Sequence, residues 1–466
     1  MDLISIAELI ADLRPLGICS GPPLILPEGA LPPGEVLDRW ARAAALAEPR
    51  VRGAASWAIR AVAQANGWIP ASIHGLYAAR GRGEWGGRTV PALNLRGWTY
   101  QTCRAAFRAA RKLEADLLIF EQAPLEMVYA DQRPAEYTAA VLAAALREGR
   151  RGPIFLQGDH VQVNAGAYAK DPAAEARRLT DLIREQIAAG YFNIDVDAST
   201  LVDLSHATLV EQQRLNAEVT ARFTRIIRGM EPAGITISVG AEIGEVGAHN
   251  TTPDELHAFM ATYRPALAAA GDGVGVSKIS INSGTHHGGV VLPDGSLARV
   301  SVAFAALAEI SRVARQEFGL SGAVQHGAST LPMEVFSRFP ESETVEIHLA
   351  LGFNNLIFDH PCLPEAVKRE IRSYVFTHHA NEKKPGQTDA QFLYTTRKKS
   401  WAALKARFWD LPADIQDAIG HSLEGMFGEM FERLNVGGTR DLVVRLARPS
   451  ALPLPPPQTL AQELAR

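Results

Sequence analysis

The stretch VGVSKISINSGTHHGG, residues 274–289, decides the fold predicted for this chain. Its first half is an alternating apolar run typical of a buried strand, and its second half breaks into glycine. The pattern predicts a strand that ends in a tight turn, and this turn presents the imidazole of His287. Two more strand-like runs end in the same way: residues 153–157 lead into Asp159-His160, and residues 322–325 lead into His326.

One histidine near a strand end is more often a hydrogen-bonded structural residue than a ligand. Three of them at three strand ends, two followed directly by glycine, favour a metal site at the mouth of a parallel barrel. Neutral imidazoles suit Zn²⁺, although another divalent metal fits the same donors. Glycine beside a histidine also lets a substrate group approach backbone N–H groups, as in a phosphate cradle.

From Thr89 onward, strand-like and helix-like runs alternate. The predicted strands are residues 90–95, 115–121, 153–157, 192–197, 234–239, 274–281, 322–325 and 344–348. The predicted helices between them are residues 100–113, 134–148, 172–189, 204–228, 253–270, 302–318 and 331–339. This order predicts an α/β fold, the (β/α)8 TIM barrel. An open doubly wound sheet alternates similarly, but here polar residues gather at many strand ends and not at one switch point.

The expected domain organisation has four parts. They are an N-terminal helical extension over residues 1–87, with a helix at 34–46 and a hinge at 81–87; the barrel over 88–362; C-terminal helices over 363–448; and a proline-rich tail over 449–466.

Composition argues against several classes of protein. A chain of 466 residues with 47% hydrophobic residues can bury a large core, and a net charge of −4 gives no basic footprint for nucleic acid. No apolar run reaches the roughly 18 residues of a membrane span, and the first residues lack a signal-peptide pattern. Cys19, Cys103 and Cys362 have no zinc spacing and cannot all pair, so a reducing cytoplasm is expected.

Five motifs in chain order resemble those of the class II, zinc-dependent fructose-bisphosphate (ketose-bisphosphate) aldolases. They are similar to the family's Asp-His at 159–160, Ile-Asp-Gly-Ser at 196–199, Ala-Glu-Leu-Gly at 241–244, Gly-Thr-Ser-His-Gly at 284–288 and His-Gly-Ala-Ser at 326–329. Residues 91–95 also look like the family's first barrel strand. The resemblance covers roughly residues 89 to 360.

This resemblance implies a set of site residues. The zinc ligands would be His160, His287 and His326, with Glu242 as an alternate or second-site ligand, and Asp159 would exchange a proton at the cleaved bond. The implied substrate and phosphate contacts are Gly288, Gly327, Ser329 and Asp359. The implied activity is reversible aldol cleavage of a phosphorylated ketose, by default fructose 1,6-bisphosphate to dihydroxyacetone phosphate and glyceraldehyde 3-phosphate, by a homo-oligomeric glycolytic enzyme.

Structural alternatives stay open for several of these residues. Asp159 could simply orient His160, and Glu242 could be a structural carboxylate at a strand end. Asp197 is as easily a residue that orients a neighbour as a catalytic one. Ser329 could cap a following helix. His286 has no counterpart in the family and is expected to support a neighbour or to face solvent.

Two stretches depart from the family pattern. The family's last strand ends in Asn-x-Asp-Thr-Asp, and the stretch aligned with it, residues 357–361, keeps only Asp359. The loop at residues 247–253 lacks the carboxylate that serves the family as a base, so His249 or Glu245 would have to replace it unless His249 has no role.

These departures keep other functions open. One is a metal-dependent lyase or isomerase that acts on another sugar phosphate. Another is a non-catalytic stabilising subunit of a tagatose-bisphosphate-type aldolase. Schiff-base catalysis is disfavoured because no lysine lies at a comparable strand end.

Overall fold

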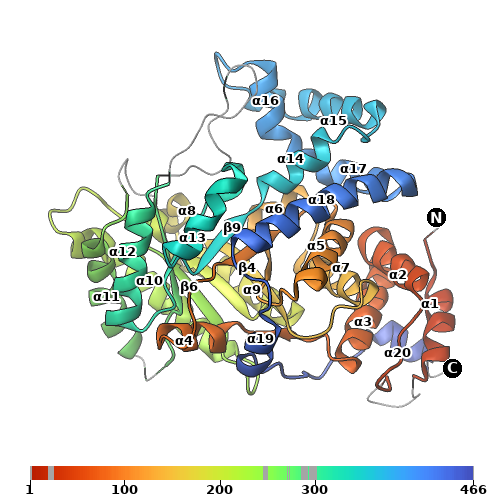
Figure 1. Ribbon diagram of the computed structural model, residues 1–466, viewed down its shortest axis with the longest axis horizontal. Helices are drawn as coiled ribbons and strands as arrows, with labels where there is room; N and C mark the ends of the chain where they lie inside the picture. The colour runs from red at the N-terminus through yellow and green to blue at the C-terminus, as the bar shows by residue number, and fades with distance from the viewer. Residues whose placement is uncertain are drawn as a thin grey trace.

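The computed structural model describes residues 3–18, 26–244, 250–269, 271, 273–284, 292 and 302–464. Within them, eight parallel strands close into a barrel, because the first of them pairs with the last (Figure 1). The strands are β2 (Val90–Asn94), β3 (Ile119–Gln122), β4 (Ile154–Gln162), β5 (Asn193–Asp197), β6 (Ser238–Glu242), β7 (Lys278–Ile281), β8 (Ala323–Gln325) and β9 (Glu346–Leu349). The predicted (β/α)8 barrel is confirmed.

Helices connect the strands and cover the outside of the barrel. They are α5 (Thr99–Leu113), α7 (Pro134–Arg147), α9 (Pro172–Ala189), α10 (Leu209–Met230), α11 (Pro253–Ala268), α12 (Phe304–Phe318) and the short α13 (Arg338–Glu341). Helix α9 shows why these sequences form helices. The Asp171 side chain accepts hydrogen bonds from two backbone N–H groups of its first turn, and Gly190 ends it in the left-handed conformation. Its buried Leu179 and Ile183, four residues apart, face the sheet.

Several predicted elements have other bounds in the structure. Strand β7, predicted over 274–281, begins at Lys278, and β3, predicted over 115–121, begins at Ile119. Strand β6 begins at Ser238 and not at Gly234, because residues 232–235 form a turn in which Gly234 has a φ of 80°. Helix α10 begins at Leu209, where the Thr208 side chain caps it. The helix predicted at 331–339 is mostly the 3-10 turn η4 (Met333–Ser337). The shift of β6 makes Glu242 its last residue.

An early segment closes the base of the barrel. The short β1 (Pro70–Ala71) pairs with the start of β4, and α4 (His74–Gly81) follows it beneath the strands. The Tyr77 hydroxyl donates to the Glu346 carboxylate, and the buried Arg80 guanidinium donates to three backbone carbonyls. Part of the expected N-terminal extension therefore belongs to the barrel floor.

The N-terminal helices α1 (Ile6–Leu13), α2 (Gly34–Leu46) and α3 (Pro49–Ala65) pack at one side of the barrel, next to α20 (Gln458–Leu464) (Figure 1). Helix α2 has the predicted bounds. Trp57 Nε1 donates to the Leu454 carbonyl at 3.0 Å, which holds the proline-rich segment against α3.

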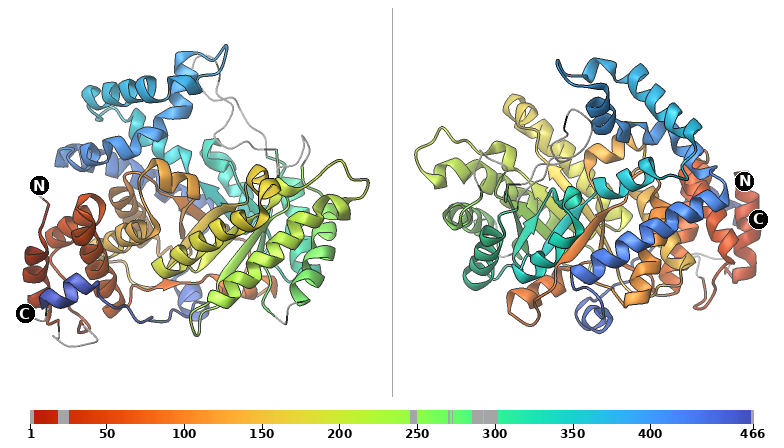
Figure 2. Two further views of the ribbon diagram at one scale, coloured as in Figure 1. Left: turned by 180° about the vertical axis from the view of Figure 1, so that it is seen from behind. Right: turned by 45° about the horizontal axis from the view of Figure 1, so that its top comes forward.

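The C-terminal region begins where the barrel strands end. Its elements are α14 (Leu351–Asp359), α15 (Glu365–His378), α16 (Asp389–Thr396), η6 (Arg397–Ser400), α17 (Trp401–Trp409), α18 (Ala413–Arg433) and α19 (Arg440–Leu446). Helix α18 packs along α5 on the outside of the barrel (Figure 2). Helix α17 is joined to α7 by the buried pair of Lys405 and Glu136, 2.7 Å apart. No helix among the described residues is both long and apolar enough to cross a membrane.

Candidate active site

Polar side chains fill the centre of the barrel in a lower layer. Side chains alternate between the two faces of a strand, so each barrel strand points some of them into the barrel. Four strands contribute the polar residues of this layer, which are Gln157, Asp195, Lys278 and Glu346. The Lys278 ammonium lies 2.8 Å from Gln157 Oε1, 2.9 Å from Asp195 Oδ2 and 2.5 Å from Glu346 Oε1. A Cβ atom at Gly240 would collide with Asp195 and Lys278, so glycine leaves room for this layer.

This layer keeps Lys278 charged. Burial disfavours the ammonium, but the charges of Asp195 and Glu346 outweigh it and raise the pKa of Lys278 above its usual value. A lysine nucleophile requires the neutral amine, which these carboxylates disfavour. Lys278 also stands at the start of β7 and not at its end. The layer supports the prediction against Schiff-base chemistry.

The upper layer begins with a β-bulge in β4. The pairing of β4 with β5 shifts register between Gly158 and Val161, and His160 has a φ of 41°. Adjacent residues of a regular strand point to opposite faces, whereas a bulge re-aims one of them. Asp159 and His160 therefore both reach the same cluster, although they are neighbours in sequence.

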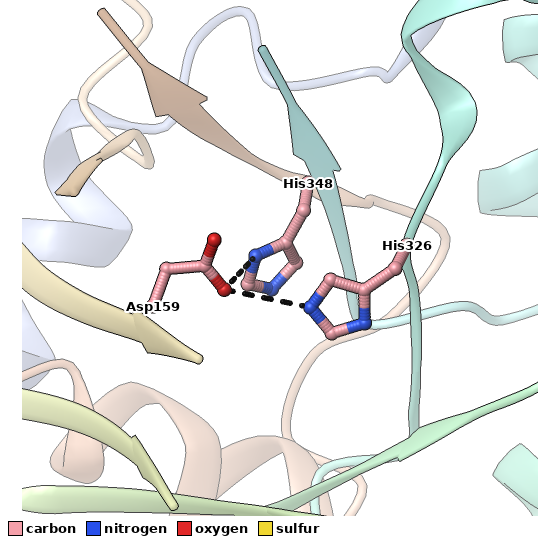
Figure 3. A group of neighbouring side chains, drawn as sticks. All are labelled: Asp159, His326 and His348. Carbon is pink, nitrogen blue, oxygen red and sulfur yellow. Dashed lines mark ion pairs between the residues drawn. The ribbon is translucent and has the colours of Figure 1, made fainter. Parts of the chain in front are cut away.

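Asp159 faces two neighbouring imidazoles with one carboxylate oxygen (Figure 3). Its Oδ1 atom is 3.6 Å from His326 Nε2 and 3.2 Å from His348 Nδ1. Burial opposes ionisation of Asp159, but the charges of His160 and His348 prevail and hold its pKa well below the usual range. Burial and the two neighbouring imidazoles lower the pKa of His326, which favours the neutral ring that a metal requires.

His160 belongs to a second group that shares His326. Its Nδ1 atom lies 3.5 Å from Glu242 Oε2, and its ring centroid is 4.3 Å from that of His326. Asp197 Oδ2 lies 3.2 Å from the same Nδ1, while Asp197 Oδ1 accepts from the Ser199 hydroxyl at 2.6 Å. Asp197 thus holds the His160 ring in place.

The structure adds His348 and Glu121, which the sequence analysis did not select. Glu121 Oε2 lies 2.9 Å from His348 Nδ1, and burial followed by the charge of Asp159 raises the pKa of Glu121 to about 7. Both residues end or nearly end predicted strands. The signal that could have found them is the alternation of polar residues, as in Glu346-Ile347-His348, within otherwise apolar strands.

The donors fit a divalent metal. Three groups place their ligand atoms within 4.8 Å of one another: Asp159, His326 and His348; His160, Glu242 and His326; and Glu121, Glu346 and His348. Asp159 Oδ1 and both ring nitrogens of His348 are buried, and in the structure they contact one another and the carboxylates of Glu121 and Glu346 at 2.8 to 3.2 Å. The same atoms are therefore close enough together to bind one ion. Imidazole and carboxylate donors suit zinc and related ions.

The other predicted site residues fall into three cases. Gly327 and Ser329 line the same cavity as the cluster, and the Ser329 hydroxyl accepts from the backbone N–H of Ala350 at 2.7 Å, so it caps no helix there. Asp359 lies at the end of α14, is 61% exposed and pairs with Arg397, so the structure does not bring it to the cluster. His249, His286, His287 and Gly288 lie outside the described residues.

The alignment of the last strand is corrected by the structure. Residues 357–359 belong to helix α14, and the last strand, β9, ends at Leu349. His348 occupies the strand-end position that the alignment with the family assigns to Ile357. The error arose because α14 follows β9 after one residue, so the apolar run continues from strand into helix.

A cavity of about 310 Å³ contains the cluster and extends toward the C-terminal region. One end is lined by Asp159, His160, His326 and His348, and the other by Arg96, Tyr394, Thr395 and Lys398. A second, more open cavity of about 970 Å³ shares His160, Glu126 and Lys398 with it. Such volumes accommodate small molecules.

No protein-family model matches the chain, and no curated protein matches it. Solved structures share its fold. One is described as a probable tagatose 6 phosphate kinase from Sinorhizobium meliloti 1021, with 14% identity, a TM-score of 0.54, and coverage of 74% of this chain and 100% of that one. Another is the fructuronate-tagaturonate epimerase UxaE from Cohnella laeviribosi, with 12% identity, a TM-score of 0.51, and coverage of 75% and 82%.

A fructose-bisphosphate aldolase from Campylobacter jejuni aligns at 14% identity with a TM-score of 0.43, over 78% of this chain and 94% of its own. The two similarities with TM-scores above 0.5 show a common barrel fold, and identities this low show nothing finer.

Proposed function

We propose that this chain is a metal-dependent carbon–carbon lyase that cleaves a phosphorylated ketose by a reversible aldol reaction. The observation that carries the proposal is a cluster of donors at the carboxyl ends of the barrel strands. Asp159, His160, His326 and His348 line one cavity, and Glu242, which belongs to a donor group with His160 and His326, lines the adjoining cavity. In (β/α)8 enzymes this end of the barrel holds the active site.

The proposed ligands are His326 with His160 and Glu242, or His326 with Asp159 and His348. Each set offers three protein donors and leaves a position open for substrate oxygen. A bound divalent metal supplies Lewis-acid polarisation of the substrate carbonyl. His287 stays part of the proposed ligand set from the family resemblance.

The chain's own residues move the proton. Asp159 is ionised, lies beside the ligands and accepts the proton of the hydroxyl next to the cleaved bond at a carboxylate oxygen. Glu121, with a pKa of about 7, contacts the same His348 nitrogen, Nδ1, as Asp159 does, and can hold or return a proton.

A coupled assay of fructose 1,6-bisphosphate cleavage tests the proposal, with and without a chelator. The expected result is metal-dependent cleavage that is lost in His326→Ala and kept in His360→Ala, a matched histidine that is hydrogen-bonded to Ser422 away from the cavity. No cleavage by folded, metal-loaded protein would rule out this substrate and turn the search to other sugar phosphates. No cleavage together with no bound metal would favour the non-catalytic stabilising subunit.

A further inference from the structure

A cationic group at the far end of the cavity has no part in the metal chemistry. Lys398 lies on the 3-10 turn η6 and lines both cavities. No carboxylate among the described residues pairs with its ammonium, and the charges that act on it most are those of Arg96 and Lys399. Burial, followed by the positive charge of Arg96, lowers the pKa of Lys398 to about 8.

Arg96 stands beside Lys398, directly after β2. It is only 7% exposed, its Nη1 atom pairs with Glu126, and its Nε atom is buried without a hydrogen-bond partner among the described residues. Glu126 is shared, because it also accepts from Asn94 Nδ2 and from the backbone N–H of Ala123. Arg96 therefore pairs with Glu126, whereas the ammonium of Lys398 has no carboxylate partner among the described residues.

Aromatic packing sets this geometry. Both cations contact the ring of Tyr129, whose centroid is 5.8 Å from the Arg96 guanidinium and 6.0 Å from Lys398 Nζ. Gly97, with a φ of 87°, has no Cβ, which would otherwise collide with the indole of Trp401. The contact of Gly97 with Trp401 brings η6 against the end of β2, and so brings Lys398 to Arg96.

We propose that Lys398 and Arg96 form an anion-binding subsite that holds the phosphate or carboxylate at the end of a ketose chain, while the metal cluster holds its carbonyl end. The inference names the substrate class of the proposed lyase and rests on that function for the position of the carbonyl. A bound anion would satisfy the buried Arg96 Nε atom and neutralise the unpaired ammonium, which is expensive to bury alone. A ketose without an anionic end would leave both unsatisfied.

The first test uses inorganic phosphate and needs no turnover. Calorimetric titration of metal-loaded wild type should show binding that weakens by about tenfold or more in Lys398→Met. Lys398→Arg should retain most of it. The matched control is Lys399→Met, because Lys399 pairs with Glu382 and does not line either cavity. Equal phosphate binding by wild type and Lys398→Met, both folded and with equal metal content, would overturn the subsite.

The second test distinguishes a phosphate from a carboxylate as the bound group. It also distinguishes failure of the anion-binding subsite from failure of the proposed lyase activity. Fructose 6-phosphate, fructuronate and fructose are titrated into the same metal-loaded proteins. The subsite predicts that the preferred anionic sugar loses about tenfold in Lys398→Met, whereas weak binding of fructose is unchanged. An equal loss for fructose would overturn it. Phosphate binding that depends on Lys398, combined with absent cleavage of every sugar phosphate, would support the subsite and reject the lyase.

Discussion

The two ends of the cavity are built on opposite electrostatic principles. At the barrel end, histidines and carboxylates are crowded at distances of 2.9 to 3.6 Å, on strands fixed by the sheet. At the other end, Lys398 stands on a turn of the C-terminal region with no carboxylate partner among the described residues. The carboxylates of Glu121, Asp159 and Glu242 at the barrel mouth, here called the negative cup, suit a cation. The C-terminal region supplies a positive end that suits an anion.

The largest effect is expected on protein stability when the Lys278 ammonium at the centre of the barrel is removed. Lys278→Met should lower the free energy of unfolding by about 3–5 kcal/mol, because Asp195 and Glu346 would remain buried and uncompensated. Chemical denaturation measures the loss. Lys399→Met, which breaks an exposed pair, should cost no more than about 1 kcal/mol. The double variant Lys278→Met/Glu346→Gln should recover part of the loss. If the single variant is as stable as the Lys399 control, the central layer does not stabilise the barrel as described.

The next effect concerns the metal. His326→Ala should weaken metal binding by more than about 100-fold, because His326 belongs to both ligand groups at the mouth, whereas loss of a residue that only orients a ligand costs about 10- to 100-fold. Competition with a chromophoric chelator measures the affinity, with His360→Ala as the control. Unchanged affinity in His326→Ala would place the metal elsewhere.

Anion binding at the Lys398 end of the cavity should depend on pH. The Lys398 ammonium is protonated below its pKa of about 8 and loses its charge above it, so anion binding should weaken as the pH rises through that value. Sulfate is a suitable probe because it does not titrate there. The expected decrease approaches about tenfold per pH unit, and it should vanish in Lys398→Arg, since arginine stays charged. A profile that is equally steep in the arginine variant would assign the titration to another group.

The smallest effect is expected at Asp359, because this residue lines neither cavity. Asp359→Asn should change stability by less than about 1 kcal/mol, because its pair with Arg397 is largely exposed. The affinity for sugar phosphates should be unchanged. Thermal unfolding and ligand titration check both points, and a large loss of affinity would bring Asp359 back into the site.

The barrel itself could be predicted from local patterns. Apolar strands alternating with amphipathic helices give the order of elements, and caps such as Asp171 and Gly190 mark where helices begin and end. Of the site, the sequence gives Asp159, His160, Glu242 and His326, because each follows or ends an apolar run. The structure places Asp159, His160 and His326 around one cavity and Glu242 around the adjoining one, beside His160.

The missed residues lack such a local signal. His348 and Glu121 approach each other from β9 and β3, and their pairing depends on the closure of the barrel, which no short window of sequence contains. Lys398 reaches Arg96 only because Trp401 packs against Gly97, a contact between residues some 300 positions apart, whose energy comes from packing that sequence periodicity does not encode.

The pairing of β2 with β9 also sets an order of events during synthesis. The ring cannot close until residue 349 has left the ribosome, and the turn that carries Lys398 emerges later still. Domains fold as units, with N-terminal parts first. A nascent chain therefore passes through a stage in which the residues of the negative cup and Arg96 have emerged but Lys398 has not. At that stage the pair that would hold a sugar anion is incomplete.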